Sequence, residues 1–136
     1  MKDVESTLMY NWFQEVWNKN NRDAIDALLT DDVITHGLSE NGHTVGKEAY
    51  LQFYDGFQQN YTDIQVTVED VIQNEDTEIA RCRVHALHTA SGKPLNFTGI
   101  CIARFVDGKI AEAWNEFNFL AMYQQLGFTL AAPMAV

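Results

Sequence analysis

The segment GKIAEAWNEFNFLAMYQQLG, from Gly108 to Gly127, decides the fold because it joins a turn, a strand and a short amphipathic helix. Asp107-Gly108 is a strong hairpin signal, and the residues after it predict a strand over 110–117. The spacing of apolar residues then becomes helical over 119–126, and Gly127 ends the predicted helix. Polar and aromatic side chains alternate along the strand, which predicts that one of its faces lines a pocket.

Three helices are predicted before the sheet, because apolar residues recur there at spacings of three and four. They cover residues 4–19, 22–29 and 46–59, with Asn21 as the expected cap of the second and Asp31-Asp32 as its end. A short strand over 33–37 and a loop over 39–44 are expected between the second and third helices.

The period changes from helical to alternating after residue 60, which predicts a sheet. Strands are expected around 64–72, over 79–89 and over 95–106, followed by the strand and helix described above. Helices followed by a largely antiparallel sheet and a short C-terminal helix indicate an α+β fold. A curved sheet around helices encloses a pocket, which is typically apolar with a few polar groups.

Composition favours one compact domain over residues 1–136, since the chain has 136 residues of which 46% are hydrophobic. Nineteen acidic and nine basic residues give a net charge of -10. Nucleic acids and anionic membranes both attract clustered Lys and Arg, so neither is expected as a partner.

Cys82 and Cys101 lie in apolar, strand-like runs and are expected to be reduced core thiols, with a bridge between neighbouring strands as the alternative. The chain has no C-x-x-C pattern, and no metal ligand set is expected. The N-terminus lacks a long apolar run, and no stretch is long and apolar enough to cross a bilayer. We therefore expect a cytoplasmic protein.

The order and spacing of several short motifs resemble the SnoaL-like polyketide cyclases of the NTF2-like superfamily, over nearly the whole chain. The matching residues are Asp31-Asp32-Val33, His36-Gly37, Gly46-Lys47-Glu48, Arg81, His88, Phe97-Thr98-Gly99, residues 107–114 and Gln124-Gln125-Leu126-Gly127. The resemblance implies an α+β cone and a homodimer. It also implies an intramolecular aldol ring closure on a polyketide-like substrate, with no cofactor and no metal.

The family places an acidic residue four positions after the tryptophan, where it moves protons. In this chain Trp114 is followed at that distance by Asn118. An amide does not titrate in the working range and can only donate or accept hydrogen bonds. Either another group is the base, or the protein is not a cyclase.

The candidate catalytic residues are His36, His88, Glu116 and Asn118. Strand alternation predicts that Glu116 and Asn118 share one face with Ile110, Glu112 and Trp114. Asn118 would orient a carbonyl or enolate oxygen, while a histidine or Glu116 would carry the proton. Glu112 is expected to pair with Arg81 or Arg104. His85 is expected on the opposite face of its strand from His88, and His43 in a surface loop.

Further residues are expected to bind the substrate. They are Trp114, Tyr50, Phe53, Tyr54, Cys82 and Arg104. A buried tyrosine usually needs a hydrogen-bond partner, so Tyr50 or Tyr54 could offer a hydroxyl to a flat ligand. Three functions remain open: cofactor-free cyclisation, non-catalytic binding in the same pocket, and isomerase or hydrolase chemistry on a steroid- or terpene-like ligand. The apolar tail over 128–136 is expected either to pack on a partner subunit or to be loose.

Overall fold

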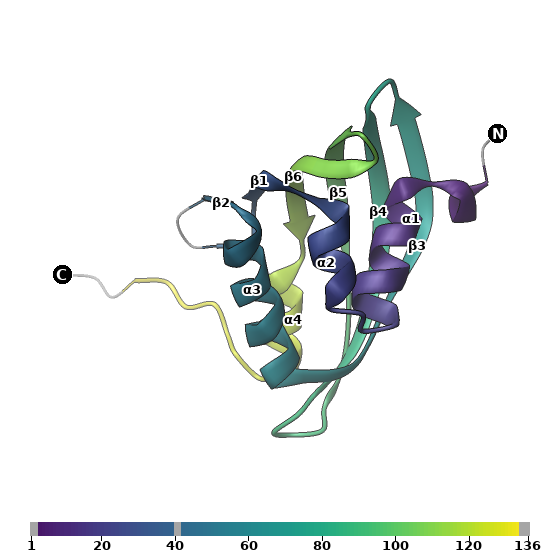
Figure 1. Ribbon diagram of the computed structural model, residues 1–136. Helices are drawn as coiled ribbons and strands as arrows, with labels where there is room; N and C mark the ends of the chain where they lie inside the picture. Colours follow the sequence, from purple (N-terminus) through teal and green to yellow (C-terminus); the bar gives the residue numbers. More distant parts are fainter. Residues whose placement is uncertain (1–2, 40–41, 134–136) are drawn as a thin grey trace.

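A computed structural model describes residues 3–39 and 42–133, and it shows helices packed on one face of a curved sheet (Figure 1). The strands are β1 (Leu29–His36), β2 (His43–Val45), β3 (Tyr61–Asn74), β4 (Thr77–His88), β5 (Pro94–Val106) and β6 (Lys109–Phe117). The helical elements are η1 (Val4–Ser6), α1 (Leu8–Trp12), η2 (Phe13–Asn18), α2 (Asp23–Leu28), α3 (Lys47–Asn60) and α4 (Phe119–Gln125).

The six strands form one sheet in the order β2-β1-β6-β5-β4-β3. Only β1 and β6 pair in parallel, and the other neighbours are antiparallel. The strands from β3 to β6 follow one another through tight connections, whereas β1 comes from the N-terminal half and closes the sheet against β6. The predicted α+β cone with helices inside a mostly antiparallel sheet is therefore confirmed.

The N-terminal helix changes from α to π geometry after Trp12, which the spacing of its apolar residues does not predict. Thr7 caps α1 by accepting a hydrogen bond from the backbone N–H of Tyr10, as short polar side chains do at helix starts. The helix then widens to π geometry in η2, where the N–H of Lys19 reaches the carbonyl of Gln14. Asn20 has a positive φ of 56° and ends this helix, in agreement with the predicted break.

Three local predictions between residues 21 and 45 are wrong. The second helix ends at Leu28, and Asp31 and Asp32 belong to β1, because pairing with β6 extends the backbone from Leu29 onward. Asn21 does not cap α2 with its side chain; its carbonyl accepts from the N–H of Ala24. His43 belongs to the edge strand β2, opposite His36, and not to a loop.

The core lies between the helices and the concave face of the sheet. Inward positions alternate along β4 and β5, and each helix contributes a stripe of buried aromatic or aliphatic side chains. Cys82 and Cys101 are both buried free thiols in this core, as predicted. No helix within the described ranges is both long and apolar enough to span a membrane.

A β-bulge in β6 decides which of its side chains face the helices. Phe105 of β5 pairs with Ile110, whereas the preceding residue Arg104 pairs with Glu112, so Ala111 is an extra residue. Ile110 and Ala113 are consequently both buried on the concave side. The alternation then continues inward with Asn115 and Phe117.

The predicted common face of β6 is therefore wrong. Glu112, Trp114 and Glu116 point to the outer face of the sheet, opposite Ile110, because the bulge shifts the alternation by one residue. Asn118 lies beyond the end of the strand.

Gly37 is required where the chain leaves β1, because its backbone lies directly against β6. Its φ is +86°, and a Cβ atom there would lie 2.0 Å from the backbone oxygen of Asn115. We expect Gly37→Ala to lower the free energy of unfolding by at least about 3 kcal/mol, since a backbone clash adds to the cost of positive φ. Urea denaturation measures this loss.

Gly42 provides a matched control, since its φ is +93° and a Cβ there would meet no described residue within 4 Å. Gly42→Ala should cost only about 1 kcal/mol, from backbone strain alone. Equal losses in the two variants would contradict the close approach of Gly37 to β6.

Candidate functional site

A cavity of about 70 Å³ lies between the concave face of the sheet and the helices. Most of its lining is aromatic or aliphatic. The residues are Trp12, Phe13, Trp17, Leu29, Val33, Thr35, Leu38, Tyr50, Phe53, Phe57, Ile64, Val66, Val84, Phe97, Cys101, Ile110, Ala113, Asn115, Phe117 and Phe119. Within the described part of the chain, this lining contains no Asp, Glu, His, Lys or Arg. The cavity therefore suits an uncharged, flat and largely apolar molecule.

Tyr50 supplies a buried hydroxyl from α3. Its oxygen accepts a hydrogen bond of 3.2 Å from the indole Nε1–H of Trp17, and its ring makes an edge contact with Trp12. Burial raises the pKa of Tyr50 far above its usual value of 10.0, and the nearby thiol of Cys101 raises it further. Tyr50 therefore stays protonated and acts as a hydrogen-bond donor, not as a base.

Asn115 brings an amide to the cavity from β6. Its Nδ2 donates a hydrogen bond of 3.0 Å to the backbone carbonyl of His36, which fixes the side chain against β1. The amide oxygen accepts no hydrogen bond from the described residues, so it is free to accept one from a ligand. Asn115 is absent from the predicted site because undisturbed alternation places it on the face opposite Trp114, and only the bulge turns that face toward the cavity.

The two thiols are poor nucleophiles. Burial raises the pKa of Cys82 to about 12 and that of Cys101 further still. Cys101 lines the cavity, whereas Cys82, predicted to bind the substrate, lies in the core outside the lining. Cys101 therefore offers an apolar, polarisable surface, and thiolate chemistry is not expected at either position near neutral pH.

The predicted catalytic residues do not line the cavity, and among them Glu116 and Asn118 border the same hollow on the outer face. His36 is on the outer face, where Nε2 donates to Glu112 at 2.8 Å and the ring stacks on Trp114 with centroids 5.3 Å apart. Glu116 borders a shallow hollow on the outer face, together with Arg81. Glu112 also pairs with Arg104 at 3.5 Å, as predicted for one of its two candidate partners.

The other two candidates lie at strand ends. His88 shares the inward face of β4 with Cys82, but it lies at the end of the strand and its Nδ1 is 2.8 Å from Ser91 Oγ. His85 is exposed on the other face. Asn118 caps α4, because its Oδ1 accepts a hydrogen bond of 3.0 Å from the N–H of Ala121. The position that is acidic in the family is therefore used here to start a helix.

The predicted substrate-binding residues divide between the two sides of the sheet. Tyr50 and Phe53 line the cavity. Tyr54 is buried beside it, with its hydroxyl bonded to Asn20 and to the carbonyl of Val16, and it does not reach the lining. Trp114 and Arg104 lie on the outer face, because the bulge in β6 reverses the predicted orientation.

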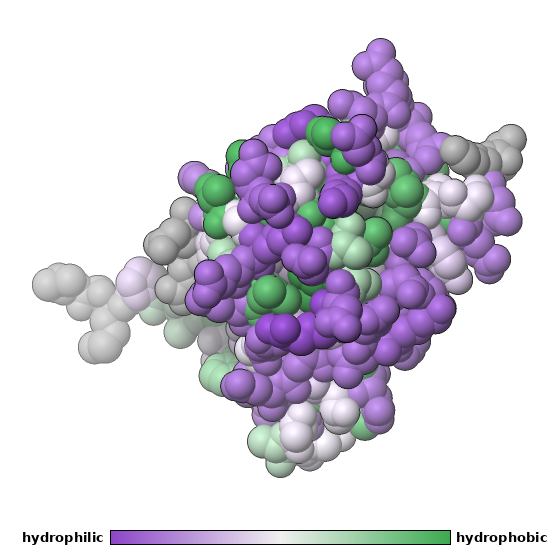
Figure 2. Space-filling model, viewed as in Figure 1, coloured by the Kyte–Doolittle hydropathy of each residue, from purple (hydrophilic) through white to green (hydrophobic). Residues whose placement is uncertain are grey.

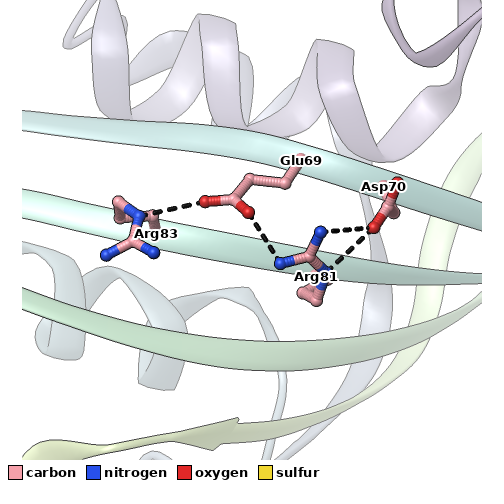
Figure 3. A network of polar contacts seen from close by, with 4 residues as sticks. All are labelled: Glu69, Asp70, Arg81 and Arg83. Carbon is pink, nitrogen blue, oxygen red and sulfur yellow. Dashed lines mark hydrogen bonds and ion pairs between the residues drawn. The ribbon is translucent and has the colours of Figure 1, made fainter.

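Charged side chains form a network on β3 and β4, away from the cavity (Figure 3). Arg81 contacts both Glu69 and Asp70 at 2.6 Å, and Arg83 bonds to Glu69 at 3.0 Å. These pairs are largely exposed, so each contributes little to stability. The four charged residues of this network lie outside the cavity lining.

The helix side of the surface is mostly hydrophilic, with hydrophobic residues in small separate patches (Figure 2).

The ion pairs of Glu112 predict a pH dependence of stability. Hydrogen bonding to His36, followed by Arg104, holds the pKa of Glu112 below its ordinary value of 4.5. A carboxylate with a lowered pKa stabilises the fold fully above pH 4.5, and this contribution is lost as the pH falls through the lowered value. Urea denaturation should therefore show Glu112→Gln destabilised at pH 7, with the difference from wild type shrinking below pH 4.5.

The control is Glu116→Gln on the same strand face, since Glu116 makes no ion pair with the described residues. Its free energy of unfolding should follow that of the wild type across this pH range. The interpretation of the Glu112 pairs is contradicted if both variants change in the same way with pH.

Comparison with known structures supports the fold independently. IdmH from Streptomyces antibioticus, a candidate polyketide cyclase, superposes with a TM-score of 0.79 at 24% identity, over 93% of this chain and 100% of IdmH. AclR from Streptomyces galilaeus, a candidate hydroxylase, has a TM-score of 0.77 at 23% identity, over 88% of this chain and 92% of AclR. At this identity the likeness establishes the fold alone.

A candidate polyketide cyclase from Bacillus cereus is 26% identical with a TM-score of 0.77, over 88% of this chain and 78% of the other. A search of curated proteins finds no significant match. The family model described as SnoaL-like polyketide cyclase matches residues 7–126, which is most of the sequence. The chain therefore belongs to the SnoaL-like polyketide cyclase family.

Proposed function

We propose that this protein binds an uncharged, aromatic, polyketide-like small molecule in the cavity between its helices and sheet. The observation that carries the proposal is the chemistry of the lining, which is aromatic and aliphatic with Thr35, Tyr50 and Asn115 as its oxygen-bearing side chains. A charged ligand would lose its hydration there without gaining a counter-ion, which is costly. Membership of the SnoaL-like family supports polyketide-like chemistry for the ligand.

The size of the cavity limits what enters without rearrangement. A cavity of roughly 150 Å³ holds a benzene-sized ligand, whereas the present one measures about 70 Å³. Even a single-ring probe therefore requires the aromatic walls to move, and a multi-ring ligand requires a larger movement, so single-ring probes are the right first test. Leu38, Phe53 and Phe57 are only partly buried and form the wall with most freedom to yield.

Aldol cyclisation is the second candidate function, and family membership favours it. Such a reaction needs a group that removes a proton from carbon. His36 and Glu116 lie on the outer face, and His88 and Asn118 at strand ends, so a base would have to reach the ligand from outside the lining. The described lining offers no group that takes this proton, so the cavity supports binding of the substrate more directly than its cyclisation.

The binding proposal predicts that neutral aromatic probes bind and that anionic ones do not. Acetophenone should bind measurably in an NMR titration, and benzoate should bind at least about tenfold more weakly because it must be desolvated. Ala113→Phe places a ring in the cavity wall and should raise the dissociation constant for acetophenone at least about tenfold.

Trp114→Phe is the matched control, since it alters an aromatic residue on the opposite face of the same strand. It should leave acetophenone binding unchanged. Equal effects of the two substitutions, or tighter binding of benzoate than of acetophenone, would refute the proposed cavity.

Asn118→Asp separates binding from catalysis. Asp caps helices about as well as Asn, so the free energy of unfolding should change by less than about 0.5 kcal/mol. Because Asn118 lies outside the cavity lining, neither wild type nor variant should accelerate deuterium exchange at the methyl group of acetophenone in D₂O. NMR measures this exchange, and acceleration only in the variant would instead favour a cyclase that has lost its acid.

A further inference from the structure

The hydroxyl of Tyr50 has an unused proton. An indole N–H can only donate, so in the hydrogen bond of 3.2 Å with Trp17 the Tyr50 oxygen is the acceptor. The Tyr50 O–H must therefore donate elsewhere, and no described residue accepts from it. Tyr50 is only 7% exposed and forms part of the wall of an apolar cavity, so a molecule in this cavity can supply the missing acceptor.

A buried donor without an acceptor is costly, by about 1–3 kcal/mol. This cost is recovered when a molecule in the cavity presents an oxygen. The other oxygen-bearing side chains of the described lining, Thr35 and Asn115, make no hydrogen bond with Tyr50, and the thiol of Cys101 is a weak acceptor. The unpartnered proton thus indicates a ligand oxygen.

The neighbouring aromatic side chains hold the ring of Tyr50 in place. The ring of Trp12 packs edge to face on that of Tyr50, with the ring centroids 5.4 Å apart. The ring centroid of Phe53 lies 6.0 Å from that of Tyr50. Trp17 packs in turn against Tyr54 and Phe57, with ring centroids 4.9 Å and 5.6 Å apart. The bond from Trp17 also draws charge from the hydroxyl oxygen, which strengthens the bond that Tyr50 donates. This arrangement is a preorganised donor in a site of low polarity.

We propose that Tyr50, oriented by Trp17, donates a hydrogen bond to a carbonyl oxygen of the ligand, which makes the ligand class neutral aromatic ketones and aldehydes. The inference rests on the proposed function and adds the group that the cavity recognises. A carbonyl fits because it accepts a hydrogen bond without bringing a charge or a donor of its own. The amide oxygen of Asn115 can accept from a hydroxyl elsewhere on the same ligand.

Acetophenone and α-methylstyrene test the proposal, because they have nearly the same shape and differ in a carbonyl oxygen. In the wild type, acetophenone should bind about fivefold more tightly, the value of one hydrogen bond. The C=O stretch of bound acetophenone should shift to lower frequency than in hexane. Tyr50→Phe should abolish both the preference and the shift.

Tyr54→Phe is the matched control. Tyr54 lies one turn further along α3, and its hydroxyl bonds to Val16 and Asn20, outside the cavity lining. This variant should keep the preference for acetophenone and the frequency shift.

Equal binding of the two probes to the wild type overturns this inference while leaving the proposed function intact. A preference for acetophenone that survives in Tyr50→Phe also overturns it. Failure of both probes to bind refutes the proposed function, and the inference with it. The infrared measurement on the wild type decides the matter even if Tyr50→Phe does not fold, since an unshifted carbonyl stretch excludes the hydrogen bond.

Discussion

The concave face of the sheet is mostly apolar, and the rest of the molecule is arranged to keep it from water. The buried carboxylate of Glu78 on β4 is an exception, and it accepts hydrogen bonds from the backbone N–H groups of Leu8 and Met9 in α1. Inward side chains of β3, β4, β5 and β6 form one hydrophobic surface, and the N-terminal helices with α3 cover it. Burial of apolar area is the largest favourable contribution to folding. The helices contribute rigid aromatic rings, which pack edge to face and leave a space between them. The cavity is thus a consequence of how the core is built.

The same separation of apolar and polar surfaces explains why the described residues of the cavity lining include no charged side chain. Glu112, Arg104 and His36 form their contacts on the outer face, where water reaches them. Tyr50 and Asn115 face inward and are neutral. A pocket of this kind recognises shape and hydrogen-bonding groups, and it can influence a reaction chiefly by holding the reactant in one conformation.

Much of the fold follows from sequence periodicity, because helices and strands bury apolar residues at different spacings. Tyr50 and Phe53 were predictable cavity residues, since their helix has one continuous aromatic stripe. The start of β1 was not predictable, because the polar pair Asp31-Asp32 resembles a helix end and is extended only through pairing with β6. Asn115 was missed for a similar reason, since no local signal marks the bulge at Ala111.

The bulge also bears on how residues are compared across the family. The bulge lets Ile110 and Ala113, three residues apart, both face the interior, whereas a strand of the same length without a bulge would place Ile110, Glu112, Trp114 and Glu116 on one face. Loss of Ala111 alone would leave Glu112 and Glu116 on the outer face, whereas a shift of one residue in the pairing of β6 beyond the bulge would turn both carboxylates inward. Equivalence of sites between relatives should be judged from strand register, because counting from the tryptophan assumes that the register is shared.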